Sequence, residues 1–405
     1  MQPNSAVAAG LPRTSTRVNA MNVSAIKHIE LLAEELSGVI SLGQGTPSFA
    51  TPDHIREFAQ QKIAEGAADK YSLGPGIKPL RNAIAGKLHS KNGIRADPAT
   101  EILVTVGANE ALSLSILAVV EPGDEVLITV PGYSPHFEQV RMAGGVPVFV
   151  PLMEDDNWEL DTAVLERAIT SRTKAVIVNT PVNPTGSVLG ESVLKEIAEI
   201  ALRHNLFIIT DETYEDFTYD GARHFSIASI PEVKDLTISN FSFSKSYALT
   251  GWRCGYVHAS APMIGHFLKL HDALCVCTPM SAQYAALAAL TGPQDIIAGF
   301  GQELDRRRRL MLKRMAEIPR FTCNVPQGAY YILLRIENID DAYTYCLELL
   351  RSARVVIVPG TGFGPTTPIH ARLSYCMTED LINEAFDRIS CFEAQVAPAA
   401  IRSGK

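Results

Sequence analysis

Residues 242–253 read Ser-Phe-Ser-Lys-Ser-Tyr-Ala-Leu-Thr-Gly-Trp-Arg, and this stretch decides how the rest of the chain is interpreted. It directly follows a β-prone run, so it is typical of a loop that leaves the end of a strand. Hydroxyls and a planar guanidinium bind phosphate, and Ser242, Ser244 and Arg253 supply them here. Lys245 by itself would be an ordinary surface lysine, but an amine beside a phosphate pocket suggests a lysine that forms a Schiff base.

The chain around this loop alternates between apolar runs and helical segments. Val/Ile/Leu-rich runs predict strands at residues 102–106, 126–130, 146–150, 175–178, 206–210 and 236–241, with helices such as 108–119 and 191–203 between them. Near-continuous apolar strands separated by helices predict a mostly parallel sheet that is buried on both faces. Ligands of such sheets collect beyond the carboxyl ends of the strands, which is where the polar motifs of this sequence fall.

A second, smaller α+β unit is expected at the C-terminal end. A long helical segment at 295–315 leads to predicted strands at 330–336, 355–358 and 372–375 and a helix at 379–392; earlier helices are expected at 25–36 and 52–65. We therefore predict an N-terminal arm with part of the small domain (1–45), a large ligand-binding domain (46–294) and a small C-terminal domain (295–405).

The composition indicates a soluble globular protein and excludes several classes. The chain has 405 residues, 46% of them hydrophobic and 20% charged, which is enough for two domains with sizeable cores. A net charge of −8 with both signs interspersed gives no footprint for nucleic acid, and the absence of an 18-residue apolar run predicts no membrane span. The basic run Arg306–Arg309 is interpreted as a solvated or interface face of a helix.

The cysteines and the N-terminus favour a reducing, cytoplasmic location. Seven cysteines, an odd number, are scattered through apolar stretches. The Cys275-Val276-Cys277 pair is interpreted as lacking metal-ligand company nearby, so we expect core positions and predict no metal site. The first 29 residues contain no acid, yet an early Pro/Gly content favours a disordered arm over a transit peptide.

Further candidate residues follow the predicted strands. The Gly107-Ala108-Asn109 turn would expose helix N–H groups to a phosphate, although any strand-to-helix turn can contain glycine. Tyr133 could stack on an aromatic ring or simply pack at a domain edge. Asp211 could face the same crevice or cap a helix. Arg372 lies in an apolar strand, where burial is costly unless an anion pairs with it.

Together these motifs resemble the fold-type I, pyridoxal-phosphate (PLP)-dependent aminotransferases of class I/II, in the aspartate/aromatic aminotransferase family. The likeness spans about residues 41–389 and rests on Ser-Phe-Ser-Lys at 242–245, Thr-Gly-Trp-Arg at 250–253 and Asn-Thr-Pro-Val-Asn-Pro-Thr-Gly at 179–186. It implies the PLP-dependent transferase fold of type I, with a mostly parallel central sheet, helices on both faces and a smaller α+β domain. It also implies PLP as cofactor and ping-pong exchange of an amino group between an L-amino acid and a 2-oxo acid.

The resemblance assigns a role to each motif residue. Lys245 would hold PLP covalently and move the substrate proton, Asp211 would pair with the pyridine nitrogen, and Tyr133 would stack on the ring. Asn183 and Tyr214 would bond its phenolic oxygen. The phosphate would be held by Ala108, Asn109, Ser242, Ser244 and Arg253, and by Tyr71 of a neighbouring subunit, which implies a homodimer; the substrate carboxylate would be held by Gly45, Asn183 and Arg372.

Substrate range and reaction type stay open at this point. Some dicarboxylate-selective relatives carry lysine where this chain has Asn109, so an aromatic or broad-range donor is favoured over a strictly dicarboxylic one. A PLP-dependent lyase or cyclase on the same fold is the alternative, because motifs around the cofactor barely separate these reactions. A DNA-binding regulator and an NAD-dependent dehydrogenase are disfavoured, since no recognition-helix pattern precedes Ser41 and no Gly-x-Gly-x-x-Gly follows the first strand.

Overall fold

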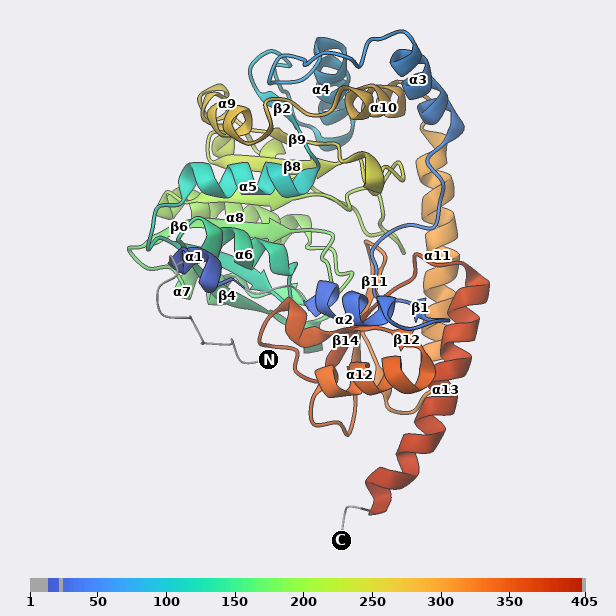
Figure 1. Cartoon of the computed structure of the whole chain (residues 1–405). Helices are drawn as coiled ribbons and strands as arrows, with labels where there is room; N and C mark the ends of the chain where they lie inside the picture. The colour runs from blue at the N-terminus through green and yellow to red at the C-terminus, as the bar shows by residue number, and fades with distance from the viewer. Residues whose placement is uncertain (1–13, 22–24, 403–405) are drawn as a thin grey trace.

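The computed structural model describes residues 14–21 and 25–402, and Figure 1 shows them as a large α/β body joined by one long helix to a smaller body. Residues 1–13 and 22–24 of the predicted disordered arm lie outside the described residues. The described part of that arm contains a short helix, α1 (Thr16–Asn19).

The centre of the large body is an eight-stranded sheet within the described residues, in the order β2-β9-β8-β7-β6-β3-β4-β5. Strands β8, β7, β6, β3 and β4 run parallel to one another, whereas β9 is antiparallel to both neighbours and β5 is antiparallel to β4. The mostly parallel sheet predicted from the apolar runs is confirmed. The strands are β2 (Ile102–Thr105), β3 (Glu125–Val130), β4 (Val146–Met153), β5 (Glu159–Leu160), β6 (Thr173–Asn179), β7 (Phe207–Asp211), β8 (Thr237–Ser242) and β9 (Gly255–His258).

Helices cover both faces of this sheet because its strands are apolar on both sides. One face packs against α5 (Ala108–Val119), α6 (Ser134–Met142) and α9 (Ala261–Cys275), and the other against α7 (Thr162–Arg167) and α8 (Glu191–His204). A third apolar cluster joins the β2/β9 side of the sheet to α3 (Asp53–Ala64), α4 (Lys78–Asn92) and α10 (Met280–Thr291).

The smaller body contains an antiparallel sheet in the order β10-β11-β14-β13 and a parallel pair, β1 with β12. Its elements are β1 (Ile40–Ser41), β10 (Phe321–Thr322), β11 (Tyr331–Ile336), β12 (Val355–Val356), β13 (Val358–Pro359), β14 (His370–Ser374), α2 (Ala25–Glu34), α12 (Ala342–Ala353) and α13 (Glu379–Arg402). The predicted single strand at 355–358 is wrong: it is divided between two sheets. Helix α11 (Asp295–Met315) runs from the large body into this one (Figure 1).

One apolar cluster contains side chains from α2, β1, α11, β11, α12, β14 and α13. The N-terminal residues after 25 therefore pack with the C-terminal part of the chain. We propose that the two bodies are the large and small domains, with boundaries near residues 45 and 294.

Arg306–Arg309 is expected to form a solvated or interface face of a helix, and the solvated alternative is wrong for half of the run. Arg307 and Arg308 are buried. Arg307 donates to Ser48 and the carbonyl of Cys376, and Arg308 pairs with Asp220 at 2.7 Å. Consecutive helical residues point in different directions, so a run of four arginines covers both the outer and the inner side of α11.

The surroundings of Cys275 also differ from the expectation. Helices α5 and α9 bring Glu110 and His271 beside it: the Glu110 carboxylate lies 2.8 Å from His271 Nδ1, and Cys275 Sγ lies 3.1 Å from the same carboxylate. The prediction that this cysteine lacks potential metal ligands nearby is therefore wrong. His271 lies about one turn earlier on the same helix, and Glu110 comes from a distant part of the sequence. Cys277 is buried, as predicted.

Candidate active site

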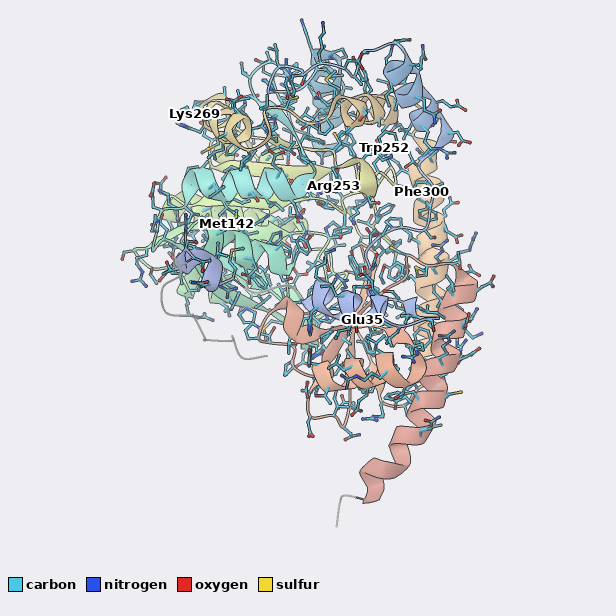
Figure 2. All side chains as sticks on the ribbon, viewed as in Figure 1. Glu35, Met142, Trp252, Arg253, Lys269 and Phe300 are labelled. Atoms are coloured by element: carbon cyan, nitrogen blue, oxygen red, sulfur yellow. The ribbon has the colours of Figure 1, made fainter. Side chains whose placement is uncertain are left out.

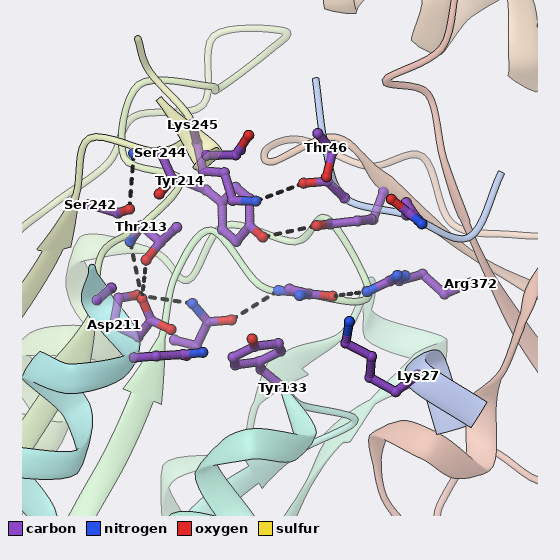
Figure 3. A pocket seen from close by; sticks show the side chains of 18 of the residues that line it. Lys27, Thr46, Tyr133, Asp211, Thr213, Tyr214, Ser242, Ser244, Lys245 and Arg372 are labelled. Atoms are coloured by element: carbon purple, nitrogen blue, oxygen red, sulfur yellow. Dashed lines mark hydrogen bonds between the residues drawn. The ribbon is translucent and has the colours of Figure 1, made fainter. Parts of the chain in front are cut away.

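A cavity of about 470 Å³ lies where the carboxyl ends of the central strands meet α2, the 43–46 turn and β14. With one exception it is lined by every residue that the sequence analysis placed in the site, and Figure 3 shows several of them around one space. These are Gly45, Ala108, Asn109, Tyr133, Asn183, Asp211, Tyr214, Ser242, Ser244, Lys245, Arg253 and Arg372. The exception is Tyr71, whose side chain lies in a loop and is exposed.

Lys245 lies in the loop after β8 and points into the cavity. Its Nζ donates to the carbonyl of Gly45 at 2.6 Å. Burial, helped by the nearby Arg372 and Arg253 guanidinium groups, lowers the pKa of this amine from 10.5 to about 8. A substantial fraction of the amine is therefore neutral, and nucleophilic, near physiological pH.

Asp211 ends β7 and is buried at the opposite side of the cavity. Burial alone would raise the pKa of its carboxyl group, but hydrogen bonds from His136 and Thr213 outweigh burial and lower it. His136 Nε2 lies 3.1 Å from Oδ2, and the Thr213 hydroxyl donates to Oδ1 at 2.6 Å. The cavity thus contains a buried, ionised carboxylate with a fixed orientation.

The groups predicted to bind phosphate converge at the N-terminus of α5. Gly107 has φ +74°, a conformation that favours glycine, and a Cβ atom at this position would lie 2.5 Å from Nη2 of Arg253, so another residue would be strained and would displace the guanidinium. Figure 2 also shows Arg253 at this end of α5. The Arg253 guanidinium donates to the Thr250 carbonyl at 3.0 Å and lies 3.5 Å from the Ser244 hydroxyl. A cation, hydroxyls and free helix N–H groups together form a site for a dianion.

Arg372, on β14, is 2% exposed. Its guanidinium donates to the carbonyl of Gly43 and to Oδ1 of Asn183, the latter at 3.1 Å, and it stacks on Tyr331 with 4.4 Å to the ring centroid. Its Nε has no partner, and no carboxylate among the described residues pairs with it. A buried guanidinium with only neutral acceptors is suited to bind a ligand carboxylate.

Two consecutive tyrosines hold Tyr214 and Gly45 in place. They are Tyr330, directly before β11, and Tyr331, the first residue of that strand. The hydroxyls of Tyr214 and Tyr331 lie 2.9 Å apart, and burial together with Tyr331 raises the pKa of Tyr214 well above its ordinary value. Tyr214 therefore stays protonated and can donate. Tyr330 donates to the Gly45 carbonyl at 3.0 Å, and a Cβ atom at Gly45 would lie 1.8 Å from the Tyr331 hydroxyl. Glycine is therefore needed at position 45, because the backbone there lies close to the Tyr331 hydroxyl.

Sequence reasoning missed several residues that line or support the cavity. They are Lys27, Thr46, Asn179, Thr213, Thr250 and Tyr331 at its wall and His136 behind Asp211. Asn179 lies within a quoted motif, and its side chain accepts from Asn183 N–H at 2.9 Å and donates to the Asp211 carbonyl. His136 follows Tyr133 by three residues, about one helical turn, which was the only local signal for it.

Known proteins resemble this chain over nearly its whole length. The family described as Aminotransferase class I and II matches residues 37–389. This chain belongs to the class I and II aminotransferases. The aspartate aminotransferase of Pyrococcus abyssi is 40% identical over 93% of this chain and 97% of its own length, and aromatic-amino-acid aminotransferase 2 of Thermococcus litoralis is 38% identical over the same shares.

Solved structures of aminotransferases share the fold. The aromatic aminotransferase from Pyrococcus horikoshii superposes with a TM-score of 0.86 at 39% identity, covering 91% of this chain and 99% of that one. The aspartate aminotransferase from Thermus thermophilus with maleate gives a TM-score of 0.89 at 35% identity, covering 94% and 99%. The predicted family, the fold type I architecture and the transaminase class are therefore confirmed, and PLP is the cofactor of this family.

The residues of this aminotransferase fit PLP. The cavity contains a buried amine for a covalent bond, a buried carboxylate for the ring nitrogen and a dianion site at the N-terminus of α5. Tyr214 supplies a protonated hydroxyl. These groups follow the ends of three strands, β2, β7 and β8, and each matches one polar part of the cofactor.

Proposed function

We propose that this aminotransferase exchanges the amino group of an L-amino acid, aromatic or of broad range, with a 2-oxo acid in a ping-pong reaction. The observation that carries the proposal is one cavity that contains a partly neutral lysine, a buried carboxylate and a buried arginine without an acidic partner. Amino acids and 2-oxo acids are the substrates of this family.

The chain's residues divide the chemistry between binding, orientation and proton transfer. PLP, when bound in this cavity, would supply the electron sink that makes the substrate Cα–H acidic. Asp211, kept ionised by His136 and Thr213, holds a proton on the ring nitrogen by a charge-assisted hydrogen bond. Asn183 and Tyr214 donate to the phenolic oxygen, and Ala108, Asn109, Ser242, Ser244 and Arg253 hold the phosphate.

Lys245 Nζ acts as the general base at the substrate Cα once the substrate amine has displaced it. Arg372 binds the α-carboxylate through two N–H groups, with the Gly45 backbone beside it, and Tyr133 supports the ring from one face. Fixing the carboxylate and the ring together orients the Cα–H bond toward Lys245. The Tyr214 hydroxyl stays protonated, so it does not compete as a base.

We also propose a homodimer in which Tyr71 reaches the phosphate site of the neighbouring subunit. Its side chain is 82% exposed and Leu73 in the same loop is 81% exposed, which is unusual for large side chains unless a partner covers them. The seven cysteines are unpaired, which supports a cytoplasmic location. Among the residues that the structure describes, no helix has the length and apolar character needed to cross a membrane.

Amino-group exchange separates this proposal from the lyase or cyclase alternative, which the comparisons do not favour. Protein reconstituted with PLP would be incubated with L-phenylalanine, L-tyrosine or L-aspartate and 2-oxoglutarate. We expect glutamate to form in amounts equal to the 2-oxo acid made from the donor, with no dependence on ammonia. Release of ammonia, or loss of the donor without any new amino acid, would refute the proposal.

A further inference from the structure

Helix α2 presents one of its faces to the active-site cavity. The α2 residues that line the cavity are Lys27, Glu30, Leu31 and Glu34. Their spacing of three, four and seven residues places them on one face of the helix. Ile29 and Ala33, on a different side, are buried in the small-domain core. Burial of these two residues fixes the rotation of α2, so the Lys27 face lies toward the cavity.

Side-chain contacts attach this helix to the turn that bounds the cavity. Glu30 accepts from the Ser41 hydroxyl at 2.6 Å and from Gln44 Nε2 at 3.1 Å. On another side of the helix, His28 Nδ1 lies 3.2 Å from the Tyr343 hydroxyl. The helix is thus attached both to the chain segment that carries Gly45 and to α12.

Lys27 adds a second cation to the substrate end of the cavity. Figure 3 shows its side chain extending from α2, with the ammonium group pointing toward the space between Tyr133 and Arg372. Arg372 lies on β14, so the two cations enter from different elements.

Leu31 gives the same face an apolar part. Its side chain is 54% exposed although it lines the cavity. A charged and an apolar side chain one turn apart can contact different substrate side chains, a distal carboxylate in one case and an aromatic ring in the other.

We propose that Lys27 is a specificity-determining residue that binds the distal carboxylate of a dicarboxylic amino acid or 2-oxo acid. This inference rests on the proposed function and deepens it. Asn109 carries no charge, so the cation for a second carboxylate comes from α2 instead. The same cavity then serves apolar donors through Leu31 and a dicarboxylic acceptor through Lys27.

The test compares substrates within each variant. Lys27→Met keeps the apolar stem and removes the charge. We expect the ratio of kcat/KM for L-aspartate to kcat/KM for L-phenylalanine to fall by roughly ten- to thirtyfold, the range for one charge-assisted contact at an accessible site. Lys27→Arg should restore most of the ratio. Lys269→Met, on α9 and far from the cavity (Figure 2), is the matched control and should leave the ratio at the wild-type value.

The results separate a failure of the Lys27 proposal from a failure of the proposed function. An unchanged ratio in Lys27→Met, or a wild-type enzyme that uses phenylalanine but no dicarboxylic substrate, overturns the role of Lys27 and leaves the proposed function intact. A wild-type enzyme that transfers no amino group from any donor overturns the proposed function itself. A complementary variant, Leu31→Ala, should shift the ratio in the opposite direction by weakening phenylalanine use.

Discussion

The replacement Asp211→Asn tests the role of the buried carboxylate with the smallest change in shape. Thr213 can still donate to the remaining carbonyl oxygen, so the position of the side chain is kept. What is lost is the negative charge. His136 Nε2, which lies 3.1 Å from Oδ2, would have to accept from the new amide, so its tautomer would also change.

The size of the effect follows from the electrostatics of the site. The two charges are the Asp211 carboxylate and the protonated ring nitrogen of PLP. Two unit charges at about 4 Å attract each other by about 4 kcal/mol at an effective dielectric constant near 20. A neutral amide recovers about 1 kcal/mol of hydrogen bonding. The remaining loss, about 3 kcal/mol, corresponds to a fall in kcat/KM of roughly 150-fold.

The assay measures the first half-reaction and PLP retention in the same preparations. We expect kcat/KM to fall by two orders of magnitude while PLP stays bound through dialysis, because Lys245 and the phosphate site are untouched. Asp272→Asn, at an exposed position on α9, is the control and should behave as wild type. A loss of less than about tenfold with PLP still bound would refute the reasoning, and loss of PLP would show a binding role instead.

Four further predictions concern Lys245, Arg372 and Gly45. The neutral amine of Lys245 is the form that attacks PLP, and its pKa is about 8. The rate of PLP attachment to apoprotein should therefore rise with pH and level off above about pH 8. A plateau reached only above about pH 10 would contradict the lowered pKa. Lys245→Ala should lose the visible absorbance of lysine-bound PLP, and an unchanged spectrum would remove it from the site. Arg372→Lys should raise KM for the amino acid by roughly 30-fold or more because a bidentate contact is lost, and an unchanged KM would exclude carboxylate binding. Gly45→Ala should destabilise the enzyme and lower its activity, since the new Cβ would collide with Tyr331. Gly265→Ala is the control and should do neither, because the space around Gly265 is open. Equal thermal stability of the two variants would argue against the close approach of Gly45 to Tyr331.

The sequence alone determined the positions of the reactive groups along the chain. Lys245, Asp211 and Asn183 each follow or end an apolar strand, and the carboxyl ends of parallel strands meet at one edge of the sheet. Knowing the strands was therefore enough to expect these side chains in one crevice. Gly107, which follows β2, could be predicted for the same reason. Arg253 precedes the antiparallel β9 and could be predicted only from its phosphate-binding chemistry and the Thr-Gly-Trp-Arg motif.

Only the tertiary structure decided how these groups are supported and which further residues join them. His136 reaches Asp211 across 75 positions and Tyr331 reaches Tyr214 across 117, and neither contact has a local sequence pattern. The burial of Arg307 and Arg308, the neighbours of Cys275 and the entry of Lys27 into the cavity likewise depend on packing between elements far apart in the chain. Periodicity and motifs report on a residue and its near neighbours, whereas the direction of a side chain relative to a distant element is set by how the helices and sheets pack.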